Sequence, residues 1–195
     1  VQVDSDTYAI AFTGANADGF ITTVTISADG QTITERGLGP LEHDTVETYD
    51  GHLIQVDSDT YLLSYTAVDT DGVLTTFTIS ADGSTITEVA SLEHEEDRMG
   101  PSTLVQVDSD TYALIYQGPS SDGYMATFTI PTDGSSITEV SSVEHEADGP
   151  SSFTIVQVDS DTYATAYARY NGEGTIKTFN ISTSGVVNGV DISGS

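Results

Sequence analysis

Short stretches of alternating apolar and polar residues, each followed by turn-forming residues, recur along the whole chain. In the segment from 103 to 145 they read TLVQV (103–107), TYALIYQ (111–117), YMATFTI (124–130) and SITEVSSVEH (136–145). A period of two places successive side chains on opposite faces of a strand, and Val, Ile, Thr, Tyr and Phe are residues that strands favour. The connections DSD, GPSSDG and PTDGS are rich in turn formers. The pattern predicts four short strands in this segment and an all-β chain.

The same four-strand pattern occurs four times along the chain. The repeated motif QVDSDTY places equivalent aspartates at Asp4, Asp57, Asp108 and Asp159, at spacings of 53, 51 and 51 residues. Repetition at a fixed period is typical of units that share a core rather than fold independently. We therefore expect a single domain of four units, with boundaries at residues 1–50, 51–101, 102–152 and 153–195.

The second strand of each unit has one bulky face and one small face. The bulky face carries Tyr8, Ile10 and Phe12; Tyr61, Leu63 and Tyr65; Tyr112, Leu114 and Tyr116; and Tyr163, Thr165 and Tyr167. The opposite face carries Ala9 and Ala11; Leu62 and Ser64; Ala113 and Ile115; and Ala164 and Ala166. This asymmetry predicts sheets stacked face to face, with the bulky side of one filling the space beside its neighbour.

Four-stranded units with the recurring words VQVDSDTY, TFTI and ITEV resemble the blades of the β-propeller superfamily. More narrowly, they resemble the highly repetitive propeller arrays of large extracellular proteins of bacteria and archaea. The resemblance covers the whole chain, although the absence of Trp separates it from WD40 repeats. It implies a ring of blades around an axial channel, with binding on one face. Four units predict a closed four-bladed β-propeller with four antiparallel strands per blade, and a piece of a larger ring is the alternative.

The charge balance is extreme, with 31 Asp and Glu against four Lys and Arg and a formal net charge of -27. Such a surface repels nucleic-acid phosphates and anionic membranes, so neither is an expected partner. Cysteine is absent, which excludes disulfides and thiolate metal sites. No apolar run approaches the ~18 residues that span a bilayer. The carboxylates could bind calcium or another hard cation, but acidic residues in every loop favour a solvated acidic shell suited to salty water.

The chain begins at Val1, inside a repeat. We interpret it as a mature or excised piece of a longer protein, which either continues into further repeats or self-associates. With the resemblance to extracellular arrays, this places the expected location outside the cell or at its surface.

Asp-Ser-Asp recurs between the first and second strands of every unit. Two carboxylates two residues apart on a loop can ligate calcium. In a turn, by contrast, Asp and Ser side chains accept backbone N–H bonds, and presence in every unit favours this role because every unit needs the turn. Calcium is the one cofactor that the sequence does not exclude. Its candidate ligands are Asp4, Asp6, Asp57, Asp59, Asp108, Asp110, Asp159 and Asp161.

The connections between the second and third strands differ from unit to unit, reading TGANADG, TAVDTDG, QGPSSDG and RYNGEG. The connections from the fourth strand of one unit to the first strand of the next vary as well. Variable loops on a regular scaffold can determine binding specificity, so we expect a ligand to bind on the face that both sets of connections form. The candidate ligand-binding residues in them are Asn16, Asp18, Asp69, Asp71, Ser120, Asp122, Tyr170 and Asn171. Glu-His pairs at the end of the fourth strand add His43, His94 and His145, whose imidazoles could bind a metal or exchange protons. A surface hydrogen bond is the competing interpretation of each pair, and the three imidazoles are expected to lie too far apart to share an ion.

Motifs of catalysis are missing: the chain has no Gly-x-Ser-x-Gly elbow, P-loop or His-Glu-x-x-His. The only insertion is two residues long, near Gly39 and Pro40, whereas enzymes commonly break repeat symmetry to build a pocket. We therefore expect a non-catalytic binding or display module that recognises a carbohydrate or a surface protein, as adhesion modules do. The alternatives are a structural spacer or assembly unit of a large repetitive surface protein and a glycan-active hydrolase.

Overall fold

The computed structural model describes residues 1–194, and side chains as far as residue 188. Within that range the chain forms strands and three short 3-10 turns, without an α-helix. The strands are β1 Thr7–Thr13, β2 Gly19–Ile26, β3 Ile33–Glu35, β4 Leu41–Asp44, β5 Tyr49–Gln55, β6 Thr60–Thr66, β7 Gly72–Ile79, β8 Ile86–Glu95, β9 Ser102–Gln106, β10 Thr111–Gln117, β11 Gly123–Thr129, β12 Thr138–Glu146, β13 Ser151–Gln157, β14 Thr162–Ala168, β15 Gly174–Ile181 and β16 Val187–Gly194. The turns are η1 Ala15–Ala17, η2 Val68–Thr70 and η3 Pro119–Ser121. No helix in the described part of the chain has the length and apolarity needed to cross a membrane.

Each of the last three units is a four-stranded antiparallel sheet whose strands pair in chain order, β5-β6-β7-β8, β9-β10-β11-β12 and β13-β14-β15-β16. In the third unit the observed strands begin and end within two residues of the predicted ones, and β10 coincides with its prediction. Short connections suffice because consecutive strands are hydrogen-bonded neighbours. The prediction of an all-β chain made of four-stranded antiparallel sheets is confirmed.

The first sheet departs from this pattern at both of its edges. Its outer strand is divided into β3 and β4, which both pair with β2. The division falls at the insertion, where Gly37 and Gly39 have φ of +67° and +105° and Pro40 has no N–H to donate to a ladder. Its inner strand is reduced to one antiparallel bridge between Gln2 and Tyr8.

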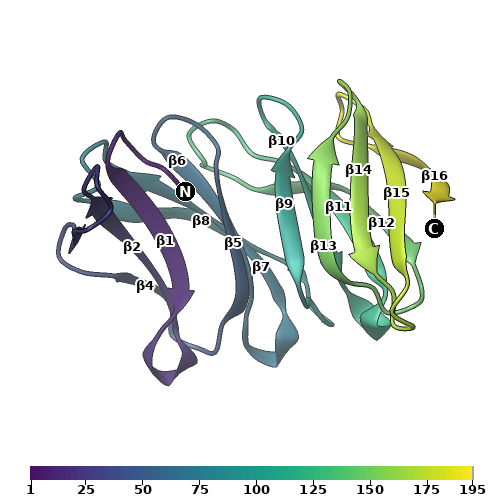
Figure 1. Ribbon diagram of the computed structural model, residues 1–195, viewed down its shortest axis with the longest axis horizontal. Helices are drawn as coiled ribbons and strands as arrows, with labels where there is room; N and C mark the ends of the chain where they lie inside the picture. Colours follow the sequence, from purple (N-terminus) through teal and green to yellow (C-terminus); the bar gives the residue numbers. More distant parts are fainter. Residues whose placement is uncertain (195) are drawn as a thin grey trace.

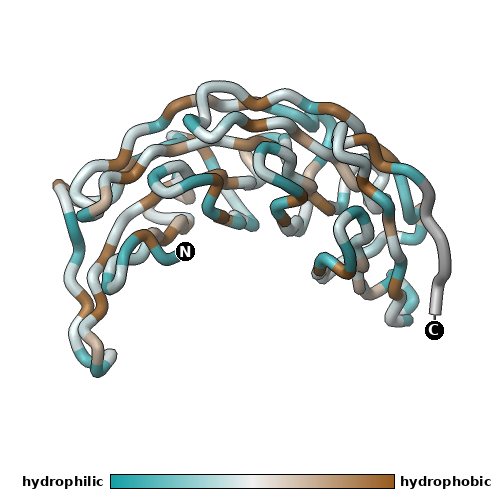
Figure 2. The backbone as a smooth tube through the Cα atoms, turned by 90° about the horizontal axis from the view of Figure 1, so that it is seen from above, coloured by the Kyte–Doolittle hydropathy of each residue, from teal (hydrophilic) through white to brown (hydrophobic). Residues whose placement is uncertain are grey.

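Figure 2 shows the four sheets side by side along an open arc, with the N- and C-terminal sheets at opposite ends of it. In Figure 1 the sheets follow one another in chain order from β1 to β16. The expected closed four-bladed wheel is therefore corrected to a propeller-like open arc. Closing a ring of four would need a quarter turn between neighbouring sheets. Rings lie in each contact, as His43 on Phe77, His94 on Phe128 and His145 on Phe179 do. Their bulk keeps neighbouring sheets more nearly face to face.

The contacts between sheets pair a small flank with an aromatic flank, as the alternation predicts. Ala9 and Ile21 pack on Tyr61, Leu63 and Phe77; Leu62 and Leu74 pack on Tyr112, Leu114 and Phe128; and Ala113, Ile115 and Met125 pack on Tyr163, Phe179 and Ile181. A threonine hydroxyl crosses each contact to a glycine carbonyl in the turn of the next sheet. These bonds run from Thr23 to Gly83, from Thr76 to Gly134 and from Thr127 to Gly185, at 2.5, 2.7 and 2.5 Å. Burial of both flanks supplies most of the stabilisation, and the threonine bonds fix the register between sheets.

The antiparallel order places the connections at two rims of the arc. One rim carries the connections between β1 and β2, β6 and β7, β10 and β11, and β14 and β15, together with the links from one sheet to the next. We call this the variable rim. The opposite rim carries every Asp-Ser-Asp turn.

Candidate functional site

A groove of about 400 Å³ lies on the variable rim between the third and fourth sheets. Its walls are the η3 turn, the link from β12 to β13 and the connection from β14 to β15. The lining residues are Ser120, Ser121, Asp148, Gly149, Tyr170 and Asn171. Three of them, Ser120, Tyr170 and Asn171, are sequence-predicted ligand-binding residues that come from different sheets. We call this the rim groove.

The rim groove is open because a glycine stands where the preceding link has an arginine. Arg98 follows His94 by four residues, and Gly149 follows His145 by the same distance. Between the second and third sheets, Arg98 donates from Nη1 to Ser121 Oγ at 2.9 Å and from Nη2 to Gln117 Oε1 at 3.0 Å. Its side chain therefore covers the space between the β8–β9 link and the η3 turn. Gly149 has no side chain to do so, and only the Cβ of Tyr170 would approach an added methyl group, at 3.5 Å.

The backbone of the groove is held by specific contacts. The N–H of Tyr170 donates to the carbonyl of Asp148 at 3.1 Å and ties two walls together. Asn171 Oδ1 accepts the N–H of Glu173 at 3.0 Å, which braces the β14–β15 turn. The Tyr170 side chain is 93% exposed and stands free beside the groove. The site therefore presents an aromatic face, hydroxyls, an amide and one carboxylate to solvent.

The η3 wall has a strained backbone. Ser120 and Ser121 have φ of +58° and +69°, in the left-handed region that non-glycine residues rarely adopt. The η1 and η2 turns share this conformation at Asn16, Ala17, Asp69 and Thr70. Strain of this kind persists only where the surrounding structure holds it in place, and it is concentrated at functional turns.

A buried ion cluster lies beside the groove. Glu146 Oε2 accepts bonds from Tyr167 Oη at 2.7 Å and from Arg169 Nη2 at 2.8 Å, and Lys177 Nζ lies 3.3 Å away. Burial alone would raise the pKa of Glu146, but the bonds from Tyr167 and Arg169 and the Lys177 charge outweigh it and lower the pKa to about 2. Lys177 also donates to the carbonyl of His145. The cluster anchors the start of the link that carries Asp148.

The three predicted histidines lie between sheets rather than in the rim groove. His94 stacks edge-on against Tyr116 and Phe128, with ring centroids 5.3 Å away in both cases. Within the described structure neither nitrogen of His94 or of His145 has a hydrogen-bond partner, so the expected surface hydrogen bond does not form there. Burial lowers the pKa of His94 and of His145 to about 4, and the Lys177 charge acts in the same direction on His145. The three imidazoles belong to three separate contacts and are not brought together.

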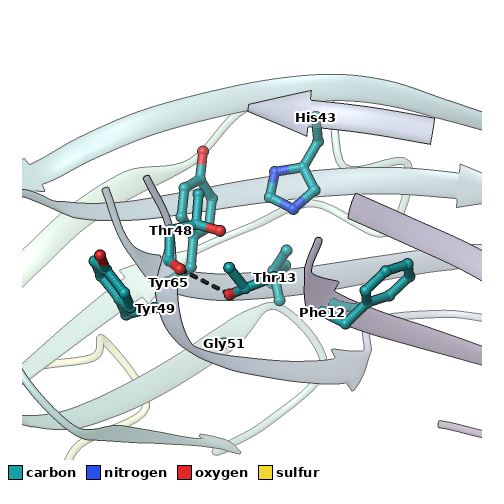
Figure 3. A pocket seen from close by; sticks show the side chains of 9 residues that line it. Phe12, Thr13, His43, Thr48, Tyr49, Gly51 and Tyr65 are labelled. Atoms are coloured by element: carbon teal, nitrogen blue, oxygen red, sulfur yellow. Dashed lines mark hydrogen bonds between the residues drawn. The ribbon is translucent and has the colours of Figure 1, made fainter. Parts of the chain in front are cut away.

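His43 borders a small hollow between the first and second sheets (Figure 3). Thr13 Oγ1 donates to the carbonyl of Thr48 at 2.7 Å across this hollow, and Tyr65 lies on its far side. The hollow holds about 30 Å³, which is space for one water rather than for a substrate. This contact therefore serves packing between sheets.

The Asp-Ser-Asp motifs form tight turns on the rim opposite the groove. Asp108 Oδ1 accepts the N–H groups of Asp110 and Thr111 at 3.1 and 3.0 Å. Asp4 and Asp159 accept the N–H of the following serine at 2.6 and 2.7 Å. In the described residues no three His, Asp or Glu side chains gather in a way that could hold a metal ion. The first carboxylate of the motif thus serves its own turn in three of the four copies.

The remaining predicted ligand residues lie on the variable rim but outside the groove. Asn16 and Asp69 sit in the η1 and η2 turns, and Asp18, Asp71 and Asp122 each follow such a turn. The N–H of Gly14, Ala67 and Gly118 donates to the carbonyl of Asp18, Asp71 and Asp122, respectively, at 2.8–2.9 Å. These three aspartates close the hairpins.

Two parts of the site were missed by sequence reasoning. Asp148 and Ser121 were not singled out, although both lie in the variable connections. The Glu146 cluster was missed as well, yet Arg169 and Lys177 are two of only four basic residues and both fall in the last unit. That concentration of rare positive charge is a signal that could have pointed to this end of the chain.

The fold is propeller-like, and several solved structures share it. A protein from Lactobacillus plantarum matches with a TM-score of 0.65 and 18% identity, over 90% of this chain and 51% of its own. A putative 6-phosphogluconolactonase from Bacteroides uniformis matches with a TM-score of 0.59 and 12% identity, over 93% and 56%. The periplasmic gluconolactonase of Pseudomonas aeruginosa matches with a TM-score of 0.55 and 13% identity, over 96% and 67%. No family model and no curated protein matches the chain. The chain spans about half the length of the first of these structures.

These comparisons contradict the expectation of a non-catalytic module. That expectation rested on the premise that a regular repeat without large insertions argues against catalysis. Two proteins named as lactonases share this propeller-like fold, so the fold itself does not argue against catalysis. The expectation that the chain is not an enzyme is corrected accordingly. At identities of 12–13% the likeness itself shows the fold, and any activity has to be argued from the site.

Proposed function

We propose that this chain forms the substrate-binding part of a hydrolase that opens a neutral sugar lactone in the rim groove. The observation that carries the proposal is the set of groups lining that groove: one carboxylate, two serine hydroxyls, one amide and one exposed aromatic ring. Sugars present hydroxyls around their edge and C–H groups on their faces. Hydrogen-bonding groups beside the Tyr170 ring match both kinds of surface.

The number of carboxylates favours an ester substrate over a glycoside. Glycoside hydrolysis ordinarily uses two carboxyl groups facing each other across the bond that breaks. Asp148 is the only acidic residue that lines the rim groove. One general base is enough for water to attack a lactone carbonyl.

The reaction follows from these groups. Asp148 accepts a proton from water as the hydroxyl adds to the lactone carbonyl carbon. The ring C–O bond then breaks, and the ring oxygen takes that proton, which yields the open hydroxy acid. In this proposal the serine hydroxyls donate to the oxygen on which negative charge develops, while the Asn171 amide, whose Nδ2 donates to Glu173 Oε2 at 3.0 Å, helps to shape that wall.

Charge narrows the class of substrate further. A formal net charge of -27 creates a field that repels anions. This favours an uncharged sugar lactone over a phosphorylated one, and it also speeds the departure of the carboxylate product.

The test compares lactone opening by the wild-type chain and by Asp148→Asn, using proton release at constant pH and an uncharged aldonolactone. Asp97→Asn is the matched control, because Asp97 occupies the equivalent position in the preceding link, where Arg98 fills the gap. We expect Asp148→Asn to lower kcat/KM by about 10²-fold or more while Asp97→Asn leaves it within about twofold. Lactone opening by the wild-type chain at no more than the solvent rate, or equal rates for both variants, would refute the proposal.

A second variant separates binding from catalysis. Gly149→Arg places in the rim groove the side chain that fills the preceding gap, at a residue with φ of +59°. We expect it to raise KM or abolish sugar binding, with the thermal melt showing that the fold survives. An unchanged KM in a folded Gly149→Arg variant would show that the substrate binds elsewhere.

A further inference from the structure

The contact between sheets is directional. In each of the three contacts the sheet that comes earlier in the chain offers its small flank, and the later sheet offers its aromatic flank. Among the described residues, no sheet covers the aromatic flank of the first sheet, and none covers the small flank of the fourth sheet. One end of the arc is therefore an aromatic flank and the other end is a small flank. These are the two surfaces that meet in every contact between neighbouring sheets.

The unpaired flank of the first sheet exposes large apolar side chains. Ile10 is 45% exposed, whereas the equivalent Leu63 and Leu114 are at most 1% exposed. Phe12 is 41% exposed, whereas the equivalent tyrosines of the other three sheets are 5% or less. Phe12 stacks on Phe20 of its own sheet, with centroids 5.8 Å apart.

The unpaired flank of the fourth sheet shows the complementary pattern. Ile176 is 53% exposed, whereas the equivalent residues of the other sheets, Ile21, Leu74 and Met125, are fully buried. Ala164 and Ala166 of β14 are half-buried, whereas the equivalent Ala113 and Ile115 are fully buried. Ile176, Ala164 and Ala166 thus occupy the positions that contact the next sheet elsewhere in the arc, and here they are exposed or half-buried.

We propose that a second copy of this chain docks head to tail, with the aromatic flank of its first sheet on the small flank of the fourth sheet. The partner chemistry is defined by continuity with the three internal contacts, which pair these two flanks. A contact between two different surfaces closes into a ring when its rotation allows and otherwise extends into a filament. The arc in Figure 2 leaves room for a second arc that faces it. Two such contacts, related by a two-fold axis, close a ring of eight sheets.

Eight sheets lie within the range that single-chain propellers use. The Lactobacillus plantarum structure, of which this chain matches 51%, agrees with four sheets being about half of such an assembly. The main opposing force is charge, because each chain carries a formal net charge of -27. Salt at about 1 M shortens the screening length to about 3 Å, so association should strengthen as salt is added.

The test measures molar mass by sedimentation equilibrium across a concentration series in about 1 M NaCl. The wild-type chain is expected to approach twice the 20.5 kDa of one chain and to stop there. Ile10→Glu and Ile176→Glu each damage one end, and each should weaken association by more than about tenfold. Val89→Glu is the matched control, because Val89 is 38% exposed on β8, away from both ends, and its variant should associate as the wild type does.

Mixing the two damaged variants tests the direction of the contact. Ile10→Glu retains an intact small flank and Ile176→Glu retains an intact aromatic flank, so an equimolar mixture regains one sound contact per pair. We expect the mixture to associate at least several-fold more tightly than either variant alone. A monomer at every concentration, growth beyond two chains, or a mixture no tighter than its components would overturn the proposal. Association does not depend on Asp148, so Asp148→Asn should dimerise normally, which keeps this result separate from that of the proposed activity.

Discussion

The buried imidazoles of His94 and His145 predict that the protein loses stability in mild acid. Each ring lies edge-on against two aromatic residues of the next sheet, and neither of its nitrogens has a hydrogen-bond partner in the described structure. Protonation would place an unpaired charge between two sheets. Burial therefore lowers the pKa of both histidines from 6.5 to about 4 in the folded chain. At His145 the Lys177 charge lowers the pKa further, and Glu146 opposes it.

The sign and size of the effect follow from linkage. Because the folded pKa is depressed, the contribution of each neutral histidine is fully present above pH 6.5 and is lost as the pH falls from 6.5 toward 4. At pH 5 the unfolded chain has protonated nearly all of each imidazole, and the folded chain about a tenth. The loss is about 2 kcal/mol per histidine and about 4 kcal/mol for the pair. For a chain of this size that corresponds to a fall in Tm of about 10 °C.

The assay follows urea unfolding by circular dichroism at pH 7 and pH 5, for the wild type and for the double variant His94→Phe, His145→Phe. Phenylalanine keeps a ring in each slot but cannot titrate. Acidification also relieves repulsion among the many carboxylates, and that effect is common to both proteins and cancels in their difference. We expect the wild type to lose about 4 kcal/mol more than the variant between the two pH values. Equal changes in both proteins would show that the imidazoles are not held neutral between the sheets.

Three further outcomes test the fold. Thr76→Val removes the hydroxyl bond to the Gly134 carbonyl and should lower the free energy of unfolding by about 1–2 kcal/mol, measured by urea titration; no loss would mean that this bond does not hold the register. Ala17 has a φ of +68°, so Ala17→Gly should raise the free energy of unfolding by about 0.5–1 kcal/mol. Ala15→Gly in the same turn should lower the free energy of unfolding. Effects of the same sign for both variants would refute the left-handed conformation of Ala17. A chelator should leave Tm unchanged, because Asp4, Asp108 and Asp159 accept bonds within their own turns, and a clear fall in Tm would instead reveal bound calcium.

Much of the fold could be predicted because it depends on local pattern and on repetition. The period of two in TYALIYQ placed β10 correctly, and the contrast between Tyr112 and Ala113 predicted which flank meets which. Closure could not be predicted in this way. It depends on the angle between sheets, which is set by the combined bulk of side chains such as Phe77 and His43 along the whole contact. No single repeat encodes that angle.

The candidate site was predicted only in part, for a related reason. The variable loops drew attention to Ser120, Tyr170 and Asn171, but the sequence does not show that these residues line one groove. The position of Asp148 opposite them depends on the packing of the third sheet on the fourth. For the histidines, the sequence indicated a site where the structure shows packing between sheets. Their place beside glutamates indicated surface chemistry, whereas the strand register turns their rings toward the aromatic flank of the next sheet.

Repetition and specificity coexist in this chain because they use different parts of it. The flanks between sheets repeat the same apolar pairing, so a change there would disturb every property that depends on the arc. Met99 of the β8–β9 link is buried in this pairing, but Arg98 and Gly149 lie outside it, and one such side chain is enough to make one link different from another. The Arg98 side chain reaches from the β8–β9 link to the third sheet and bonds Gln117 and Ser121 there, whereas Gly149 at the equivalent place has no side chain and the next gap is open. A repeat protein built this way gains a pocket without an insertion, which is why the shortness of the loops did not argue against catalysis.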